Sequence, residues 1–132
     1  MKRPGVIRHI MDSSAILAML LFEQGSDKVA EVLSHAVLSS VNLAEVIAKL
    51  TQRGLPFSEA NRMVRLLQLQ IMPFDEAQAL ASAAMYVPTR PHGLSLGDRA
   101  CLALAQRLNL PVLTADRAWG KLDLGIEVKL IR

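Results

Sequence analysis

Short apolar runs alternate with longer helical patterns along almost the whole chain, and this alternation limits the possible folds more than any other feature. The apolar runs predict strands at residues 5–11, 37–40, 71–74, 111–115 and 126–131. Helices are predicted between them, at residues 13–23, 27–36, 43–54, 58–70, 75–87, 98–109 and 117–122. Strands that alternate with helices form βαβ units, in which the paired strands run parallel. We therefore expect an α/β fold, a three-layer sandwich with a mainly parallel central sheet of about four to five strands and helices on both faces.

Proline and glycine mark the breaks in this pattern. Pro73 lies inside the third apolar run, so that strand is expected at an edge of the sheet or at a strand end. Gly54 follows a helical pattern and is predicted to end that helix. Residues 88–97 are rich in proline and glycine and are predicted as a loop.

The composition is that of one soluble domain. The chain has 132 residues, of which 52% are hydrophobic, and no linker, low-complexity stretch or repeat divides it. We therefore expect a single domain over residues 1–132. The single cysteine, Cys101, excludes a disulfide framework and a cysteine-based zinc cluster. No apolar stretch is long enough to span a bilayer, and the N-terminus does not fit a signal peptide, so we expect a cytoplasmic protein without a membrane partner.

The charge permits a polyanionic partner but does not require one. The formal net charge is +3, and the pI is near 9.4. Several arginines lie in segments that the fold can bring together: Arg53, Arg62, Arg65, Arg90, Arg99 and Arg117. Each of them, taken alone, also fits a solvated helix face.

Four of the twelve acidic residues stand where the chain enters a helix. Asp12 and Asp116 follow predicted strands, Glu45 lies one turn into a helix, and Asp98 begins another. Because open α/β sheets bind ligands beyond the carboxyl ends of their strands, we expect the four acids on one edge of the sheet. Carboxylates gathered there repel one another unless a cation or shared protons neutralise them. Because carboxylates are hard oxygen ligands, the four acids favour Mg²⁺ or Mn²⁺ over zinc, which suits phosphodiester hydrolysis.

Each acid also has a purely local explanation. Asp12 and Asp116 stand where a helix N-cap is expected. Two further pairs have the spacing of a capping box: Asn42 with Glu45, and Ser95 with Asp98. The residues alone therefore leave two interpretations open, a metal-binding acidic pocket and a set of structural caps.

Four blocks of the sequence resemble the successive signature blocks of PIN-domain ribonucleases. They are IMDSSAILAML, SSVNLAEVIAKL, LSLGDRACLALAQRLNLPVLTADRAW and the terminal IEVKLI. The resemblance covers nearly the whole chain and extends to the VapC-type toxins of bacterial toxin-antitoxin pairs. It implies a PIN-like sandwich in which Asp12, Glu45, Asp98 and Asp116 are the catalytic metal ligands of a Mg²⁺- or Mn²⁺-dependent endoribonuclease.

The same resemblance implies supporting residues and partners. Thr114 matches a position whose hydroxyl supports the pocket, and Ser13 and Ser14 match the polar pair after the first Asp. Ser14 departs from the many members that carry Asn there, which puts the hydrogen bonding around the acids in doubt. The family further implies a homodimer and a cognate antitoxin that covers the active site. Trp119 matches an aromatic position, for which core packing is the better account.

Two residues near the pocket are candidates for substrate binding. Arg99 directly follows Asp98 and is placed to contact a phosphate or an acid, although an exposed residue in the first helical turn explains it equally well. His92 lies in the predicted loop before Asp98, where it can reach a substrate. Because the chain has few aromatic residues, recognition of RNA by shape and phosphate contacts is favoured over base stacking.

Two other classes of function stay open beside the leading hypothesis of an endoribonuclease toxin. One is a non-catalytic RNA-binding or scaffold protein that keeps the fold. The other is a phosphate-signalling or phosphatase domain, which also has an Asp after its first strand. Ser14 stands where the phosphatase pattern needs a second Asp, and Asp75 is a poor candidate for the phosphoacceptor of a signalling domain.

Overall fold

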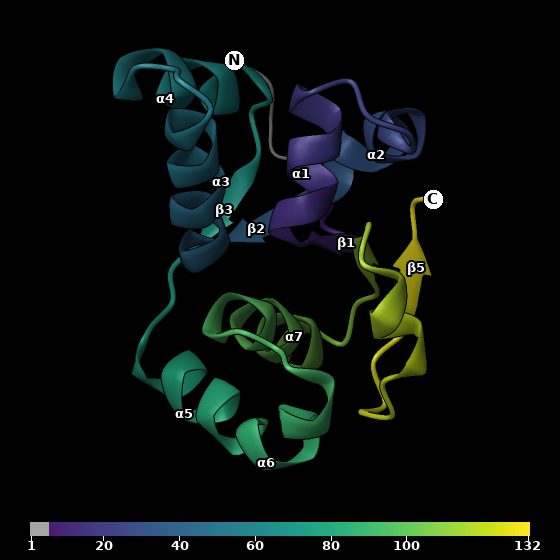
Figure 1. Ribbon diagram of the computed structural model, residues 1–132. Coiled ribbons are helices and arrows are strands. Elements are labelled where there is room, and N and C mark those ends of the chain that lie inside the picture. Colours follow the sequence, from purple (N-terminus) through teal and green to yellow (C-terminus); the bar gives the residue numbers. More distant parts are fainter. Residues whose placement is uncertain (1–5) are drawn as a thin grey trace.

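The computed structural model describes residues 6–132 and consists of one sheet between two layers of helices (Figure 1). The strands are β1 (His9–Met11), β2 (Ala36–Ser39), β3 (Gln70–Met72), β4 (Val112–Thr114) and β5 (Val128–Leu130). The α-helices are α1 (Ser13–Leu20), α2 (Ser26–Val32), α3 (Ser40–Gln52), α4 (Phe57–Leu66), α5 (Glu76–Ala84), α6 (Tyr86–Thr89) and α7 (Leu96–Leu108). Three short 3₁₀ helices are η1 (Leu33–His35), η2 (Arg90–His92) and η3 (Arg117–Lys121). The predicted α/β sandwich is confirmed.

All strand pairs of the sheet are parallel, and the spatial order is β3-β2-β1-β4-β5. The third strand is an edge strand that ends before Pro73, as predicted. The chain moves from the central β1 to β2 and β3 on one side, and then returns to build β4 and β5 on the other. The direction of winding therefore reverses between β1 and β4, and open parallel sheets bind ligands at the carboxyl ends of such a strand pair.

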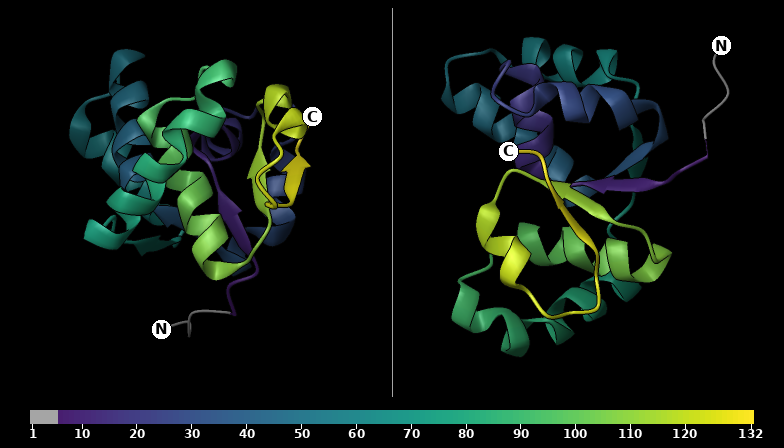
Figure 2. Two further views of the ribbon diagram at one scale, coloured as in Figure 1. Left: turned by 90° about the horizontal axis from the view of Figure 1, so that it is seen from below. Right: turned by 90° about the vertical axis from the view of Figure 1, so that its right-hand side faces the viewer.

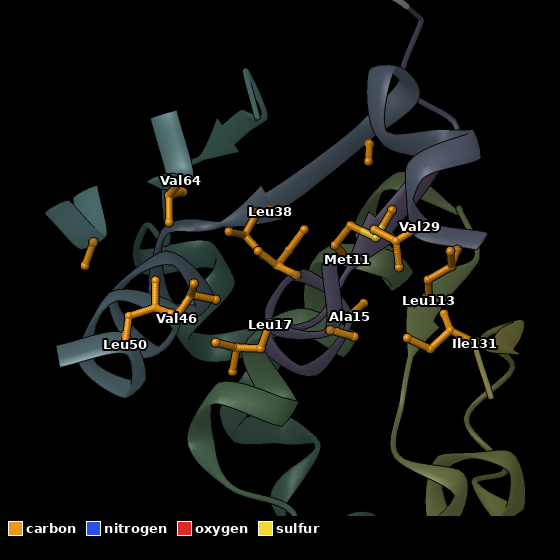
Figure 3. Packing of buried hydrophobic residues seen from close by; sticks show 14 residues of the cluster. Met11, Ala15, Leu17, Val29, Leu38, Val46, Leu50, Val64, Leu113 and Ile131 are labelled. Carbon is orange, nitrogen blue, oxygen red and sulfur yellow. The ribbon is translucent and has the colours of Figure 1, made fainter. Parts of the chain in front are cut away.

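Strand side chains alternate between the two faces of the sheet and divide the core into two clusters. The cluster beneath α1 to α4 takes from the strands Met11, Leu38 and Leu113 (Figure 3). The cluster on the opposite face takes the residues one position earlier, Ile10, Val37 and Val112. Helices lie on both faces of the sheet, as the right-hand view of Figure 2 shows. Because both faces are buried, the strands read in the sequence as continuous apolar runs.

Trp119 belongs to the second cluster, together with the apolar residues of α7. Its side chain is only 1% exposed, which confirms core packing as the account of this residue. Within residues 6–132, no helix combines the length and the apolar character that a membrane crossing requires.

Several predicted helix ends are wrong because of local backbone geometry. The helices predicted over 13–23 and 58–70 are too long, since α1 and α4 end earlier. Phe22 (φ 56°) and Gln68 (φ 55°) adopt the left-handed conformation just beyond these ends, which stops a helix. The helix predicted over 27–36 is also too long, because β2 has already begun at its last position.

The loop predicted over 88–97 is wrong as well. It contains the end of α6, all of η2 and the start of α7, while the helix predicted over 75–87 breaks after Ala84. Pro88 explains the break, because it has no N–H to donate to the carbonyl of Ala84 four residues earlier. A proline is tolerated in the first turn of a helix, so a new helix can begin at Tyr86.

Candidate active site

Asp12 is the first residue after β1, and its side chain is almost fully buried, with 5% exposed. Its carboxylate caps α1 by accepting a hydrogen bond from the N–H of Ala15 at 2.8 Å, which confirms the predicted cap. The Ser14 hydroxyl lies 2.8 Å from both carboxylate oxygens. The Thr114 hydroxyl donates to Oδ2 at 2.5 Å. Two of the three predicted supporting residues therefore contact Asp12 directly.

Ser14 and Thr114 also hold the chain that follows β4. The N–H of Ala115 donates to Ser14 Oγ at 2.9 Å, and the N–H of Asp116 donates to Thr114 Oγ1 at 3.0 Å. Each hydroxyl thus accepts from the segment after β4 and donates to Asp12. This pair of hydroxyls joins the carboxyl ends of β1 and β4, where the winding of the sheet reverses.

Glu45 enters the site from α3, on the other side of β1. Ser13 Oγ donates to Glu45 Oε1 at 2.6 Å, and Asn42 Nδ2 donates to the same oxygen at 2.8 Å. Asn42 also donates to the carbonyl of Gly97, at 3.0 Å, in the first turn of α7. Among the described residues, Oε1 therefore has two donors and Oε2 has none.

Gly97 allows the Glu45 carboxylate to approach α7 closely. A Cβ atom at Gly97 would overlap both carboxylate oxygens. The negative charge thus lies on the first turn of a helix, where backbone N–H groups favour it. Our sequence analysis assigned neither Asn42 nor Gly97 to the pocket. The available signal for Gly97 was a glycine inside the first turn of a helix, which often marks a close approach to its backbone.

The capping box predicted for Asn42 and Glu45 is wrong. The helix begins at Ser40, and its N-cap is Ser39, whose Oγ accepts from the N–H of Val41 at 3.3 Å. Asn42 is therefore a residue of the helix itself, and its buried side chain links Glu45 to α7. The predicted start of this helix at residue 43 was late, because the polar residues before it were interpreted as its cap.

Asp98 and Asp116 both cap helices, as predicted. Asp98 Oδ2 accepts from the N–H of Ser95 at 2.9 Å, and Ser95 Oγ accepts from the N–H of Asp98 at 3.1 Å, which completes a capping box. Asp116 is exposed and accepts from the N–H of Ala118 at 3.0 Å at the start of η3. Neither carboxylate is hydrogen-bonded to the other two acids in the described part of the chain.

The environment of Asp12 opposes its negative charge. Burial raises the pKa of this carboxyl to about 6, against the lowering effect of the hydrogen bonds from Thr114, Ala15 and Ser14, and the charge of Asp98 raises it further. None of the four ion pairs found within residues 6–132 involves Asp12. A positive charge bound beside Asp12 would therefore stabilise its ionised form.

Cys101 shows that three of the acids act on one region. Its buried thiol donates to the carbonyl of Met11 at 3.6 Å, beneath the end of β1. Burial raises the pKa of this thiol, and the charges of Asp12, Asp98 and Glu45 raise it further. The charges of these three carboxylates thus act on the buried end of β1, where the thiol lies, while Asp116 stands at the exposed rim beside β4.

The carboxylates fit a cation that keeps part of its water shell. Within residues 6–132, no three His, Cys, Asp or Glu side chains lie close enough together to enclose a metal ion directly. Mg²⁺ is commonly held by one or two carboxylates with waters at its remaining positions, so it does not need such a cage. The buried, uncompensated Asp12 and the free Oε2 of Glu45 are hard oxygen donors of the kind that such an ion prefers.

Arg99 and His92 lie outside the hydrogen-bond network of the acids. Arg99 Nη1 donates to the carbonyl of Leu94 at 3.1 Å, and the guanidinium stacks over the ring of Tyr86, 5.3 Å from its centroid. Arg99 therefore holds the segment that precedes α7. His92 is exposed in η2. Substrate binding by these two residues stays a prediction.

Comparisons with known proteins match this chain to one protein family and to several solved structures of the same fold. The family model described as "PIN domain" matches residues 10–124. A search of the curated proteins finds no match. The DNA-bound VapBC structure from Salmonella typhimurium contains a chain that is 16% identical, with a TM-score of 0.75, 96% of this chain covered and 100% of that chain. The FitAcB structure from Neisseria gonorrhoeae gives 23% identity and a TM-score of 0.64, covering 91% of this chain and 95% of that chain.

A third solved structure, VapBC-5 from Mycobacterium tuberculosis, is described as a member of the VapBC family of toxin-antitoxin systems. It contains a chain that is 22% identical, with a TM-score of 0.60, 94% of this chain covered and 97% of that chain. These three likenesses show the same fold. The matched residues include all four acids. Of the strands, only β5 lies outside the match. The chain therefore belongs to the PIN domain family.

Proposed function

We propose that this PIN domain is a Mg²⁺- or Mn²⁺-dependent endoribonuclease that hydrolyses RNA as the toxin of a toxin-antitoxin pair. The observation that carries the proposal is the buried Asp12 carboxylate, which lacks an ion-pair partner in the described part of the chain and shares its region with Glu45 and Asp98. A bound cation would neutralise the repulsion within such a cluster. The toxin role is supported by the similar fold of VapBC-5 from Mycobacterium tuberculosis, a member of the VapBC family of toxin-antitoxin systems.

The chain's own residues divide the work in this mechanism. Asp12, Glu45 Oε2 and Asp98, with Asp116 at the rim, would hold the metal. The metal, when bound, polarises the scissile phosphate and lowers the pKa of a bound water. Ser14 and Thr114 keep Asp12 in one orientation by donating to it. On the other side, the Ser13 and Asn42 donors occupy Glu45 Oε1 and leave Oε2 for the ion.

We also propose a cognate antitoxin, a homodimer and a cytoplasmic site of action. Apolar side chains are exposed on both helical layers, and we propose that protein partners dock at these positions. On the layer of α1 to α4 they are Phe22, Phe57 and Leu66, and on the opposite layer Leu80, Tyr86, Val87 and Leu96. A site of action in the cytoplasm would give the enzyme access to cellular RNA.

RNA cleavage by the purified protein, freed of any antitoxin, tests the proposal. We expect discrete fragments of total bacterial RNA with Mg²⁺ or Mn²⁺ and no fragments with chelator. RNA binding without cleavage at any metal concentration would instead favour the non-catalytic binding protein. Transient labelling by acetyl phosphate would favour the phosphate-signalling class, although Asp75 already serves as the N-cap of α5 and pairs with Arg107 at 3.6 Å.

Replacement of Gly97 by Ala is expected to lower kcat/KM for RNA cleavage by about 10- to 100-fold, because misplacing a catalytic group by about 1 Å costs this much. The new Cβ would push the Glu45 carboxylate off the first turn of α7. The helix itself should remain, since Ala favours a helix over Gly by about 1 kcal/mol.

Gly120→Ala is the matched control, because a Cβ atom there meets only Leu130, at an ordinary 3.7 Å. Circular dichroism and thermal unfolding check that both variants fold. Full activity of a folded Gly97→Ala variant would show that the position of Glu45 on α7 is not needed for cleavage.

A further inference from the structure

Three cationic side chains lie on the elements that carry Glu45 and Asp116, and they have no acidic partner within residues 6–132. Lys49 follows Glu45 on α3, Arg53 is the C-cap residue that ends this helix, and Arg117 directly follows Asp116 at the start of η3. All three cations are exposed. None of them takes part in the four ion pairs found within residues 6–132. Their positive charges are therefore available to a ligand.

The two cations of α3 form a stripe that starts at the pocket. Lys49 lies four residues after Glu45, and Arg53 four residues after Lys49. Residues four apart share one face of a helix, with their Cβ atoms about 6 Å apart. Ala44 and Ala48 are exposed beside this stripe, and their short side chains leave space next to the cations. A polymer backbone can therefore lie along this face with one cation per helical turn.

Arg117 stands on the opposite flank of the pocket. In the sheet, β2 leads to α3 on one side of β1, and β4 leads to η3 on the other. In Figure 1, α3 and the yellow-green segment of η3 accordingly lie on either side of α1. Lys49 and Arg53 therefore lie on the β2 side of the acids, along α3, and Arg117 lies on the β4 side.

We propose that Lys49, Arg53 and Arg117 bind the sugar-phosphate backbone of RNA and lead one strand across the acid pocket from α3 to η3. This inference rests on the proposed function, since only a substrate that crosses the pocket needs cations on both of its flanks. Contacts of this kind fix the position of a strand but carry no base specificity. They account for RNA binding by a chain with only five aromatic residues, namely three Phe, one Tyr and one Trp.

The test compares two triple variants that lose the same charge. The path variant carries Lys49→Gln, Arg53→Gln and Arg117→Gln, and the control carries Lys28→Gln, Arg62→Gln and Arg65→Gln, all exposed positions on α2 and α4. Binding of a fluorescent single-stranded RNA is measured by anisotropy at several salt concentrations, in Mg²⁺ and in an Asp116→Asn background that suppresses cleavage. Cleavage kinetics are measured separately with Asp116 intact.

We expect the path variant to bind RNA at least about 30-fold more weakly and to lose about 2 from the slope of log K against log salt, because each lost phosphate contact on a single strand contributes about 0.7. The control should change the slope by less than about 0.5, and both variants should unfold at the wild-type temperature. In the cleavage assay, KM should rise in the path variant with kcat largely kept.

Four results would overturn the inference. Equal losses in both triple variants would reduce the effect to net charge. Unchanged RNA affinity combined with lost binding of a protein partner would assign the three cations to that partner. A wild-type protein that neither binds nor cuts RNA would remove the proposed function together with the path, whereas a wild type that cuts RNA beside an unaffected path variant would remove the path alone.

Discussion

Asp116→Asn is expected to lower RNA cleavage by at least about 100-fold while the protein stays folded. Asn caps a helix about as well as Asp, so the hydrogen bond from the N–H of Ala118 to this side chain is kept. The backbone N–H of residue 116 donates to Thr114 Oγ1, and this hydrogen bond is kept as well because the substitution leaves the backbone unchanged. Only the negative charge at the rim of the pocket is lost, and with it a carboxylate ligand of the proposed metal. Cleavage of total bacterial RNA in Mg²⁺ and in Mn²⁺ measures the effect.

Asp75→Asn is the matched control for this substitution. Asp75 is also an exposed Asp that caps a helix after a strand, accepting from the N–H of Gln78 at 2.9 Å. It follows the edge strand β3, away from the pair of strands β1 and β4. We expect Asp75→Asn to cut RNA like the wild type. If both variants cut equally well, Asp116 is only a cap, and the catalytic set shrinks to Asp12, Glu45 and Asp98.

Asp12→Asn is expected to abolish cleavage and, at neutral pH in chelator, to make the metal-free protein more stable. The pKa of this carboxyl is about 6 in the folded protein, against its ordinary value of 3.8. Because the folded pKa is raised, ionisation destabilises the fold, and the wild-type free energy of unfolding falls as pH rises from about 4 to 6. Above pH 6, ionisation of Asp12 lowers the free energy of unfolding by about 3 kcal/mol.

The net gain in the Asn variant is smaller, because its amide N–H₂ faces one of the hydrogen-bond donors that the carboxylate accepts from. This unfavourable contact costs about 1 kcal/mol. We therefore expect the free energy of unfolding of Asp12→Asn to exceed that of the wild type by about 2 kcal/mol at pH 7, which raises Tm by roughly 5–10 °C. The pH dependence between about 4 and 6 should be weaker than in the wild type.

Thermal and urea unfolding in chelator, from pH 4 to pH 8, measure this difference. Added Mg²⁺ should stabilise the wild type and leave Asp12→Asn almost unchanged, because a ligand stabilises only the state that binds it. A variant that is less stable than the wild type at pH 7 in chelator would contradict the prediction. In that case the hydrogen bonds to Asp12 outweigh the cost of burying its charge.

The positions of the acids could be predicted because they depend on local pattern and on one topological rule. Asp12 and Asp116 come directly after apolar runs, and the carboxyl ends of parallel strands share one edge of a sheet. The boundary errors have local causes that a periodic pattern does not contain. Phe22 takes a left-handed backbone, and Pro88 splits one predicted helix into two.

The hydrogen-bond partners of the acids could not be predicted in this way. Ser13 and Ser14 are neighbours, yet Ser13 donates to Glu45 and Ser14 to Asp12. Consecutive residues at the start of a helix point about 100° apart, so the direction of each depends on how α1 packs against α3 and β4. Asn42 and Gly97 meet although 55 residues separate them.

The sequence by itself determined the order of strands and helices, the family, the presence of acids at strand ends and most of the helix caps, because each of these depends on neighbouring residues and their period. The tertiary structure alone decided which donor serves which carboxylate and how deeply each acid is buried. It also decided that Lys49, Arg53 and Arg117 flank the pocket whereas Arg62 and Arg65 lie on the separate helix α4. These features require the packing of segments distant in the chain, and burial in that packing is what raises the pKa of Asp12.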